Sequence, residues 1–223
     1  EIREYKFELL ASKVKDLLPK NGKVLSLGGR DGYELRLTQY SEAVIVDLCP
    51  EPENLPPGVH YIRSDILKFL EREHDEKYDL VFLIEVIEHI PPEYVISILR
   101  GIRRLLKPKG KLLLTTPNLA RPVAILSILF KGRLPGYANR NLPEEPIPPF
   151  EHLREYCKGE LSLALSKAGF KVLKMFTLSS EARYFIRHGD LVKKITRLLL
   201  MPFNMIWGET LVFLAEPSDG GKT

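Results

Sequence analysis

The sequence predicts an α/β protein built on a doubly wound, mostly parallel sheet. Short, nearly all-apolar runs of strand length alternate with turn residues or helical patterns along the chain. Strands that are apolar on both faces are typical of a parallel sheet that helices cover on both sides. Ligands of such sheets bind at the carboxyl ends of the strands, so functional residues are expected directly after them. The expected strands are residues 23–27, 43–48, 61–63, 79–84, 111–116, 170–176 and 211–215.

Three helical patterns accompany these runs. The first covers residues 3–18 and ends at the turn sequence Pro-Lys-Asn-Gly. The second lies between the fourth and fifth strands, with Pro91 and Pro92 at its start. The third ends before Gly169. Apolar residues share one face of the second and third helices: Val95, Ile98, Leu99, Ile102, Leu105 and Leu106, then Leu161, Ala164, Leu165 and Ala168.

Two segments depart from the regular alternation. Residues 118–151 combine an apolar, helix-like stretch with a proline-rich loop directly after the fifth strand. An insertion of this length in a compact domain is typically a lid or a binding element, or else disordered. Residues 190–203 form a basic amphipathic pattern, which is expected to pack on the core; contact with a membrane surface or a partner is the alternative.

Length and composition indicate a single domain over residues 1–223. The 223 residues are 44% hydrophobic and 28% charged, as in ordinary globular proteins. No run approaches the roughly 18 apolar residues that a membrane span needs. The start of the sequence does not resemble an export signal, so a cytoplasmic location is expected. Cys49 and Cys157 have no paired spacing, and the net charge of +4 permits a phosphate-bearing partner without predicting one.

The residues after the first three strands fit a nucleoside site. Gly28, Gly29 and Gly32 permit a tight turn and a close approach of the backbone to a ligand. The dinucleotide pattern G-x-G-x-x-G is absent, which argues against a nicotinamide enzyme. Asp47, at the end of the second strand, can accept hydrogen bonds from both ribose hydroxyls. Asp65 can accept from an adenine amino group, although it is equally an ordinary helix cap.

In this order and spacing, these motifs resemble the class I S-adenosylmethionine-dependent methyltransferases over residues 20–216. "VLSLGGRDG" is similar to the family's first motif, "VIVDLCP" to the second, "SDI" to the third and "YDLVFLIEVIEHI" to the fourth. The resemblance implies a seven-stranded, Rossmann-like sheet whose last strand runs antiparallel, and S-adenosylmethionine as cofactor. It implies cofactor contacts from Ser26, Gly28, Gly29, Asp31, Gly32, Asp47, Leu48, Ser64, Asp65, Ile66, Ile84 and Glu85.

Two residues depart from the first motif of the family. Ser26 stands where the family has an acid, and Arg30 stands at the middle glycine. Ser26 keeps a hydrogen-bonding oxygen without the charge that favours the methionine ammonium, so Asp31 or a water is expected to serve that group. The resulting expectation is a functional cofactor site of reduced affinity. A non-catalytic binding subunit that kept the fold is the alternative.

The pentapeptide "EVIEH", residues 85–89, is the candidate catalytic segment. If it forms a helical turn, Glu85, Glu88 and His89 lie on one face. With His152 from beyond the insertion, they could bind Mg²⁺ or Mn²⁺, which would activate an acceptor hydroxyl. The pattern resembles the metal site of small-RNA 2′-O-methyltransferases and the ubiquinone-pathway O-methyltransferases. In the alternative, no metal is bound, and Glu88, His89 and His152 line the acceptor pocket or act as general base.

The acceptor is the least determined part of the prediction. The apolar stretch "VAILSILF" between Arg121 and Lys131, with Arg133 beyond, would suit a hydrophobic or lipid-like acceptor, and peripheral membrane contact is compatible with it. The same cations, together with Arg103, Arg104, Lys107 and Lys109, could contact the phosphates of an RNA end. The chain lacks a separate basic module and an aromatic stacking stretch, so a small-molecule or lipid/glycan-precursor acceptor is favoured over RNA.

Overall fold

A seven-stranded sheet forms the centre of the protein in a computed structural model that describes residues 2–74, 76–132, 152–179 and 208–218. The strand order is β3-β2-β1-β4-β5-β7-β6, and β7 alone runs antiparallel to its neighbours. The predicted fold class is therefore confirmed. The strands are β1 Gly22–Leu27, β2 Tyr40–Asp47, β3 Val59–Arg63, β4 Tyr78–Ile84, β5 Leu106–Pro117, β6 Phe170–Leu178 and β7 Thr210–Pro217.

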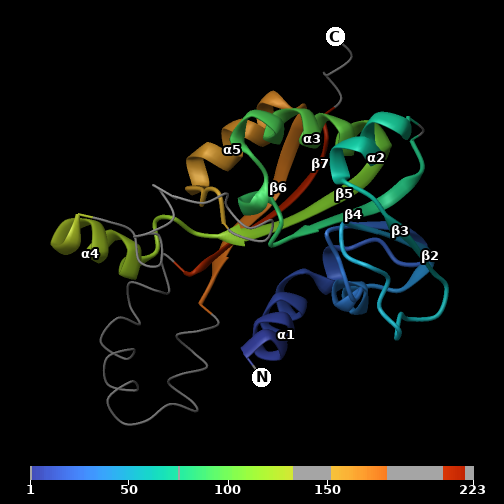
Figure 1. Cartoon of the computed structure of the whole chain (residues 1–223), viewed down its shortest axis with the longest axis horizontal. Coiled ribbons are helices and arrows are strands. Elements are labelled where there is room, and N and C mark those ends of the chain that lie inside the picture. The colour runs from blue at the N-terminus through green and yellow to red at the C-terminus, as the bar shows by residue number, and fades with distance from the viewer. Residues whose placement is uncertain (1, 75, 133–151, 180–207, 219–223) are drawn as a thin grey trace.

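Helices cover both faces of the sheet (Figure 1). One face packs against α2 (Ile66–Arg72), α3 (Pro92–Leu105) and α5 (Lys158–Lys167), which contribute Phe69, Leu99 and Leu165 to one core. The other face packs against α1 (Ile2–Val14), which contributes Leu10 and Val14 to a second core. Among the described residues, the remaining helices are α4 (Pro122–Lys131) and the 3₁₀ turns η1 (Lys15–Leu17), η2 (Tyr33–Leu37) and η3 (Ile87–His89).

The order of the strands reverses between β1 and β4, which lie side by side in the middle of the sheet. Connections from their carboxyl ends leave in opposite directions, which creates the crevice where ligands of such sheets bind. The connection from β1 to β2 holds only η2, and the connection from β2 to β3 holds no helix. The N-terminal helix α1 therefore supplies the helical cover near the end of β1, as Figure 1 shows.

The irregular segments are described only in part. Residues 118–132 of the expected lid are described and contain α4, whereas residues 133–151, including Arg133, lie outside the described residues. The predicted basic helix at 190–203 also lies outside them. Within the described residues, no helix is both long and apolar enough to cross a membrane.

Candidate functional site

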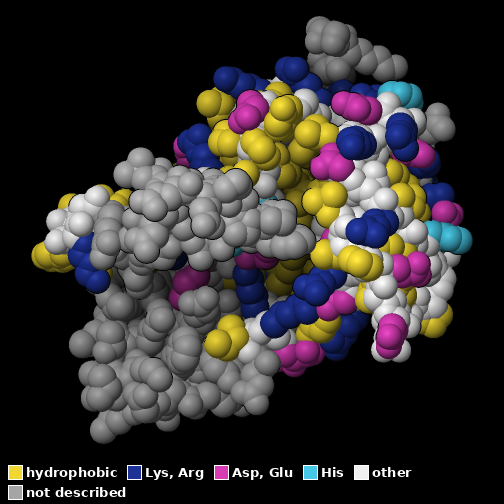
Figure 2. All heavy atoms as spheres, viewed as in Figure 1, with side chains coloured by type: hydrophobic (Ala, Val, Ile, Leu, Met, Phe, Trp, Pro, Cys, Tyr) yellow, Lys and Arg dark blue, Asp and Glu magenta, His cyan; other side chains and the backbone are white. Residues whose placement is uncertain are grey.

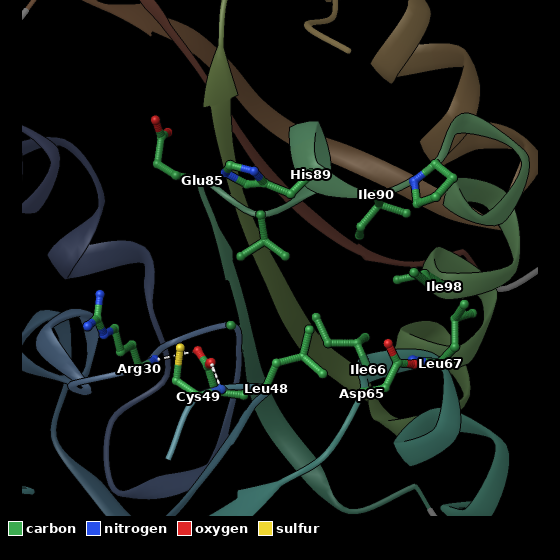
Figure 3. A pocket seen from close by; sticks show the side chains of 14 residues that line it. Arg30, Leu48, Cys49, Asp65, Ile66, Leu67, Glu85, His89, Ile90 and Ile98 are labelled. Carbon is green, nitrogen blue, oxygen red and sulfur yellow. Dashed lines mark hydrogen bonds between the residues drawn. The ribbon is translucent and has the colours of Figure 1, made fainter. Parts of the chain in front are cut away.

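A cavity of about 570 Å³ opens at the carboxyl ends of β1, β2 and β4 (Figure 3). Six of the predicted cofactor residues line it: Gly28, Asp47, Leu48, Asp65, Ile66 and Glu85. Arg30, Cys49, Leu67, Val86, His89, Ile90, Pro91 and Ile98 complete the lining. Figure 3 shows Ile66, Ile90 and Ile98 across the cavity from Arg30, so one wall is apolar and the opposite one carries polar backbone and side-chain groups. Such a combination suits a ligand with an aromatic part and a polar part.

Asp47 fixes the two loops that form the polar wall. Its Oδ2 accepts a hydrogen bond from the Arg30 N–H at 3.0 Å, and its Oδ1 accepts one from the Cys49 N–H at 2.8 Å. A carboxylate oxygen has two lone-pair sites, so each oxygen retains capacity for a ligand hydroxyl. The Arg30 side chain is exposed, and Figure 3 shows its guanidinium extending away from Cys49. The cofactor role predicted for Asp47 is therefore sterically and chemically available.

The turn after β1 depends on Gly28, whose φ is +73°. A Cβ at this position would lie 2.6 Å from Val86 Cγ2, so the glycine lets β1 approach the loop after β4 closely. Arg30 also adopts a positive φ, +42°, in place of the family's middle glycine. The non-glycine residue is accommodated because its side chain points to solvent and its N–H is bonded to Asp47.

We expect Gly28→Ala to lower the free energy of unfolding by about 2–4 kcal/mol, because it combines an unfavourable φ with a clash. Gly58→Ala is the matched control, since Gly58 has a φ of +77° and no atom within 4 Å of its hypothetical Cβ. That variant pays only the conformational cost of about 1 kcal/mol. Chemical denaturation measures both. Equal losses in the two variants would contradict the close approach of Gly28 to Val86.

Asp65 serves as the N-cap of α2. Its Oδ1 accepts hydrogen bonds from the Leu67 N–H at 2.9 Å and the Lys68 N–H at 3.2 Å. Both bonds end on one oxygen, and the residue lines the cavity. The capping interpretation is thus confirmed, and Oδ2 is left for a ligand donor.

The other six predicted cofactor residues do not line the cavity. Ser26 is buried, and Gly29 packs over it. Asp31 is held by both guanidinium nitrogens of Arg3 from α1, at 2.8 and 2.9 Å, so its charge is already paired. The remaining three support the site from behind: Gly32 is the N-cap of η2, Ser64 donates its N–H to the Asp47 carbonyl, and Ile84 packs against the α1 side of the sheet.

Glu34, in η2, is a buried carboxyl that accepts a hydrogen bond from Ser26 Oγ. Burial raises the pKa of Glu34 from 4.5 to about 7, against the lowering effect of the Ser26 hydrogen bond. The folded state therefore holds more protons than the unfolded state between these two values. The free energy of unfolding then falls as the pH rises through this interval, by about 3 kcal/mol in total.

We expect Glu34→Gln to abolish this part of the pH dependence. The variant should be more stable than the wild type at pH 8, and the difference should shrink toward pH 5. Glu71→Gln, at an exposed carboxyl of α2, is the control and should change stability by less than about 0.5 kcal/mol. Urea denaturation at several pH values measures the effect. A wild type and Glu34 variant with parallel pH profiles would show that Glu34 is not buried as described.

Glu85 does not form a helical turn with His89. Its φ is +55°, and the 3₁₀ turn η3 begins only at Ile87, so the expected common face of residues 85, 88 and 89 is wrong. The carboxylate of Glu85 accepts from Thr115 Oγ1 at 2.7 Å and pairs with Lys6 Nζ of α1 at 2.8 Å. Glu85 thereby connects α1 to the cavity, and each of its oxygens accepts one hydrogen bond.

Glu88, His89 and His152 form a second cluster beside the cavity. One ligand atom from each of the three lies within 4.8 Å of the others, and the rings of His89 and His152 meet edge to face at 4.8 Å. The segment after the insertion is fixed to η3 because the Leu153 N–H donates to the Glu88 carbonyl at 2.7 Å. Of the three, His89 lines the cavity, so the cluster adjoins any ligand bound there.

Glu88 is fully buried and carries an unused oxygen. Its Oε2 accepts from Thr116 Oγ1 at 2.9 Å, whereas its Oε1 has no hydrogen-bond partner among the described residues. Burial, assisted by the charge of Glu85, raises the pKa of Glu88 well above its usual range. A carboxyl of this kind holds a proton near neutral pH and donates it to a neighbour, rather than acting as a base.

His152 is oriented from behind by a buried ion pair. Its Nδ1 lies 3.8 Å from Glu155 Oε1, and Glu155 is also bonded to Arg121, which precedes α4. The contact with the Glu155 carboxylate raises the pKa of His152, because it favours the protonated ring. The cluster therefore contains one histidine that a carboxylate orients, an arrangement that general-base catalysis can use.

The predicted metal set is reduced to three residues. Glu88, His89 and His152 could each supply a ligand, and the unpartnered Oε1 of Glu88 fits a cation or an acceptor hydroxyl equally well. Glu85, the fourth predicted ligand, is not among the three residues whose ligand atoms lie close together, and its oxygens accept from Lys6 and Thr115. Three protein ligands with an open position are compatible with a catalytic ion, but their chemistry does not require one.

Several site residues escaped the sequence reasoning. Lys6, Arg3 and Glu155 act through contacts between distant segments, for which the sequence carries no local signal. Glu34 could have been noticed as an acid at a position otherwise flanked by apolar residues of η2. Of the apolar wall, Ile98 was predicted only as part of the apolar face of a helix, and Ile90 only as the last residue of the fourth motif.

Comparison with known proteins identifies the family to which this arrangement belongs. The pattern of the family described as "Methyltransferase domain" matches residues 2–175, which include the whole cavity lining. The chain belongs to the class I S-adenosylmethionine-dependent methyltransferase family. This methyltransferase family is the one that the motifs at the ends of the strands resemble.

Curated relatives include ubiquinone biosynthesis O-methyltransferases. The protein from Xanthomonas axonopodis pv. citri is 30% identical over 166 residues, which are 70% of this chain and 65% of that protein. The protein from Rickettsia bellii is 32% identical over 83 residues, 37% of this chain and 32% of that protein. The chain thus spans between about a third and two thirds of the length of these relatives.

Solved structures share the fold at low sequence identity. A SAM-dependent methyltransferase from Archaeoglobus fulgidus has a TM-score of 0.61 at 19% identity, covering 94% of both chains. A Burkholderia thailandensis N1-methyltransferase solved with bound S-adenosylhomocysteine has a TM-score of 0.60 at 16% identity, covering 96% of this chain and 79% of that one. The [4+2]-cyclase SpnF has a TM-score of 0.58 at 14% identity, covering 96% of this chain and 80% of that one. The fold therefore does not by itself specify the reaction.

Proposed function

We propose that the protein transfers a methyl group from S-adenosylmethionine to a hydroxyl of a small, lipid-like molecule. The observation that carries the proposal is the cavity between β1, β2 and β4, with Asp47 at its polar wall and the Glu88, His89 and His152 cluster at one side. Asp47 would hold the ribose, Asp65 Oδ2 the adenine amino group, and the apolar wall the adenine ring.

The residues of the chain would then orient the acceptor and remove its proton. S-adenosylmethionine supplies an electrophilic methyl group when it is bound, so the protein must align the nucleophile and take up one proton. His152, or His89 beside it, accepts the proton from the acceptor hydroxyl. Glu88, held in its neutral form by burial, donates a hydrogen bond to the acceptor or to the histidines. Glu155 and Arg121 keep the ring of His152 in place.

The exposed surface of α4 supports an apolar acceptor. The helix projects from the body of the protein (Figure 1), and its Leu129 and Phe130 are 72% and 83% exposed. Its only charged residue is Lys131, and Figure 2 shows hydrophobic and basic side chains together at this end of the molecule. An apolar helix with a cation at its end suits a lipid-like acceptor or the surface of a membrane that contains it. The similarity to ubiquinone biosynthesis O-methyltransferases also favours such an acceptor.

Three of the basic residues considered for RNA do not support that alternative. Arg103 donates to the Gly169 and Ser218 carbonyls, Arg104 to the Leu70 carbonyl, and Lys107 pairs with Asp79. These side chains surround the amino end of β5, whereas the cavity opens at the carboxyl ends of the strands. They are therefore used within the fold and are remote from the site.

The proposal is tested with radiolabelled S-adenosylmethionine and three hydroxyl acceptors: a soluble catechol, a catechol with a prenyl tail, and a short RNA with a free 3′ end. We expect methylation of the catechols, with the tailed one preferred. If only the RNA is methylated, the proposed acceptor is wrong and the acceptor is the RNA end. If no acceptor, including a cell extract, is methylated while the cofactor binds, the non-catalytic binding subunit becomes the better account of the fold.

A metal-assisted form of the same reaction is favoured by one observation, the unpartnered Oε1 of Glu88 beside two histidines. Dialysis against a chelator, followed by addition of Mn²⁺ or Mg²⁺, separates the two forms. Metal-assisted transfer requires that the ion restore the rate. If the rate of methyl transfer is the same with and without the ion, the metal-assisted form is wrong and the histidines act as general bases.

A further inference from the structure

Glu34 is a buried carboxyl that the proposed reaction does not use. It is 6% exposed in η2, and Ser26, 1% exposed in β1, donates its hydroxyl proton to Glu34 Oε1. A carboxyl in such surroundings is unfavourable when ionised, unless a positive charge nearby compensates for the lost hydration. Its position next to the candidate cofactor cavity indicates where such a charge could be.

The Ser26 and Glu34 side chains lie directly beneath the turn that follows β1. A Cβ at Gly29 would overlap both Ser26 Oγ and Glu34 Oε1, so the carboxyl fills the space that a side chain of residue 29 would need. The residues on either side of Gly29, Gly28 and Arg30, line the cavity. The backbone of residues 28–30 therefore separates the Glu34 carboxyl from the cavity. In a buried setting, a charge on Glu34 interacts with a charge in the cavity across one such segment.

We propose that Glu34 is a positioning residue for the cofactor, which supports the Gly28–Arg30 turn from beneath and favours cationic S-adenosylmethionine over the neutral product S-adenosylhomocysteine. The inference rests on the proposed function, since it assumes that the cavity binds this cofactor. The two compounds differ by the positive charge of the sulfonium, which only the first carries. Ionised Glu34 attracts that charge, and protonated Glu34 does not, so the preference for the cofactor increases with pH.

Other charged groups near Glu34 and the cavity set the controls. Asp31 and Arg3 face Glu34 from the turn and from α1, and they neutralise each other as an ion pair. Asp47, Glu85 and His89 line the cavity and also carry ionisable side chains. The contribution of Glu34 is therefore the difference between the wild type and a Glu34 variant, rather than the whole pH dependence of the wild type.

The test is calorimetric titration of the full chain with S-adenosylmethionine and with S-adenosylhomocysteine at pH 6 and pH 8. In the wild type, we expect the ratio of the two dissociation constants to shift toward the cofactor by roughly threefold to tenfold from pH 6 to pH 8. Glu34→Gln should remove this shift. Ser26→Ala keeps the carboxyl and removes the hydrogen bond that lowers its pKa, so this variant should keep a pH-dependent preference that moves to higher pH.

The outcomes separate the inference from the proposed function. If the ratio of the two dissociation constants is the same in the wild type and in Glu34→Gln at both pH values, the role of Glu34 is overturned. The cofactor site itself then stands. If the wild type binds neither compound, the proposed function fails and the inference fails with it.

A second measurement needs no substitution. The ¹³C chemical shift of the Glu34 carboxyl reports its titration, and we expect its midpoint to fall when S-adenosylmethionine is added and to change much less with S-adenosylhomocysteine. Equal effects of the two compounds would overturn the electrostatic part of the inference.

Discussion

Asp47→Ala is expected to weaken S-adenosylmethionine binding by about tenfold to 150-fold, which corresponds to the roughly 1.5–3 kcal/mol of a hydrogen bond to a charged group. The loss should lie toward the upper end of this interval. Asp47 accepts from the N–H groups of both Arg30 and Cys49, so the substitution also releases the two loops that form the polar wall. Calorimetric titration measures the dissociation constant. Asp47→Asn keeps the shape of the side chain and loses its charge, so its dissociation constant should lie between those of the wild type and Asp47→Ala.

Asp79→Ala is the matched control for this substitution. Asp79 also accepts a backbone N–H, from Lys23 at 2.8 Å, and it pairs with Lys107, but it lies near the amino end of β4. Its removal should lower stability and leave the dissociation constant unchanged. Comparable losses of affinity in the Asp79 and Asp47 variants would mean that Asp47 acts only through the stability of the sheet.

His152→Ala is expected to lower kcat for methyl transfer by about 10²–10⁴, the usual contribution of a general base. The substitution should leave the dissociation constant of S-adenosylmethionine unchanged, since His152 does not line the cavity. His89→Ala should lower kcat and also affect cofactor binding, because His89 lines the cavity. Steady-state kinetics with the catechol that the proposal favours measures both effects.

His60→Ala provides the control for the histidine variants. His60 is exposed in β3, away from the cluster, and its substitution should change neither kcat nor affinity. If His152→Ala keeps the wild-type kcat and His89→Ala does not, His89 is the base and His152 only supports it. Wild-type kcat in both variants would contradict base catalysis by this cluster.

The sequence was sufficient to predict the sheet and half of the cavity, because both depend on local patterns. Asp47, Asp65 and Gly28 were found since they follow strands, and the ends of parallel strands meet at one edge of the sheet. The antiparallel direction of β7 came from the family resemblance alone. The start of β5 at Leu106 was missed, because the Lys-Pro-Lys-Gly sequence after α3 is typical of a turn.

The part that could not be predicted depends on contacts between distant segments. Arg3 reaches Asp31 and Lys6 reaches Glu85, so α1 neutralises two acids that were expected to face a ligand. The positive φ of Glu85 removed it from the expected common face with Glu88 and His89. Neither feature has a signature within a short window of sequence, since both follow from how α1 and β4 pack.

Calorimetric titration of the wild-type chain with S-adenosylmethionine, with and without Mn²⁺, tests the central claim most directly. The account predicts one binding site in the micromolar range, with affinity lost in the Asp47→Ala variant. The claim is contradicted if no binding is detected in either condition, or if binding is equally strong in the Asp47 variant.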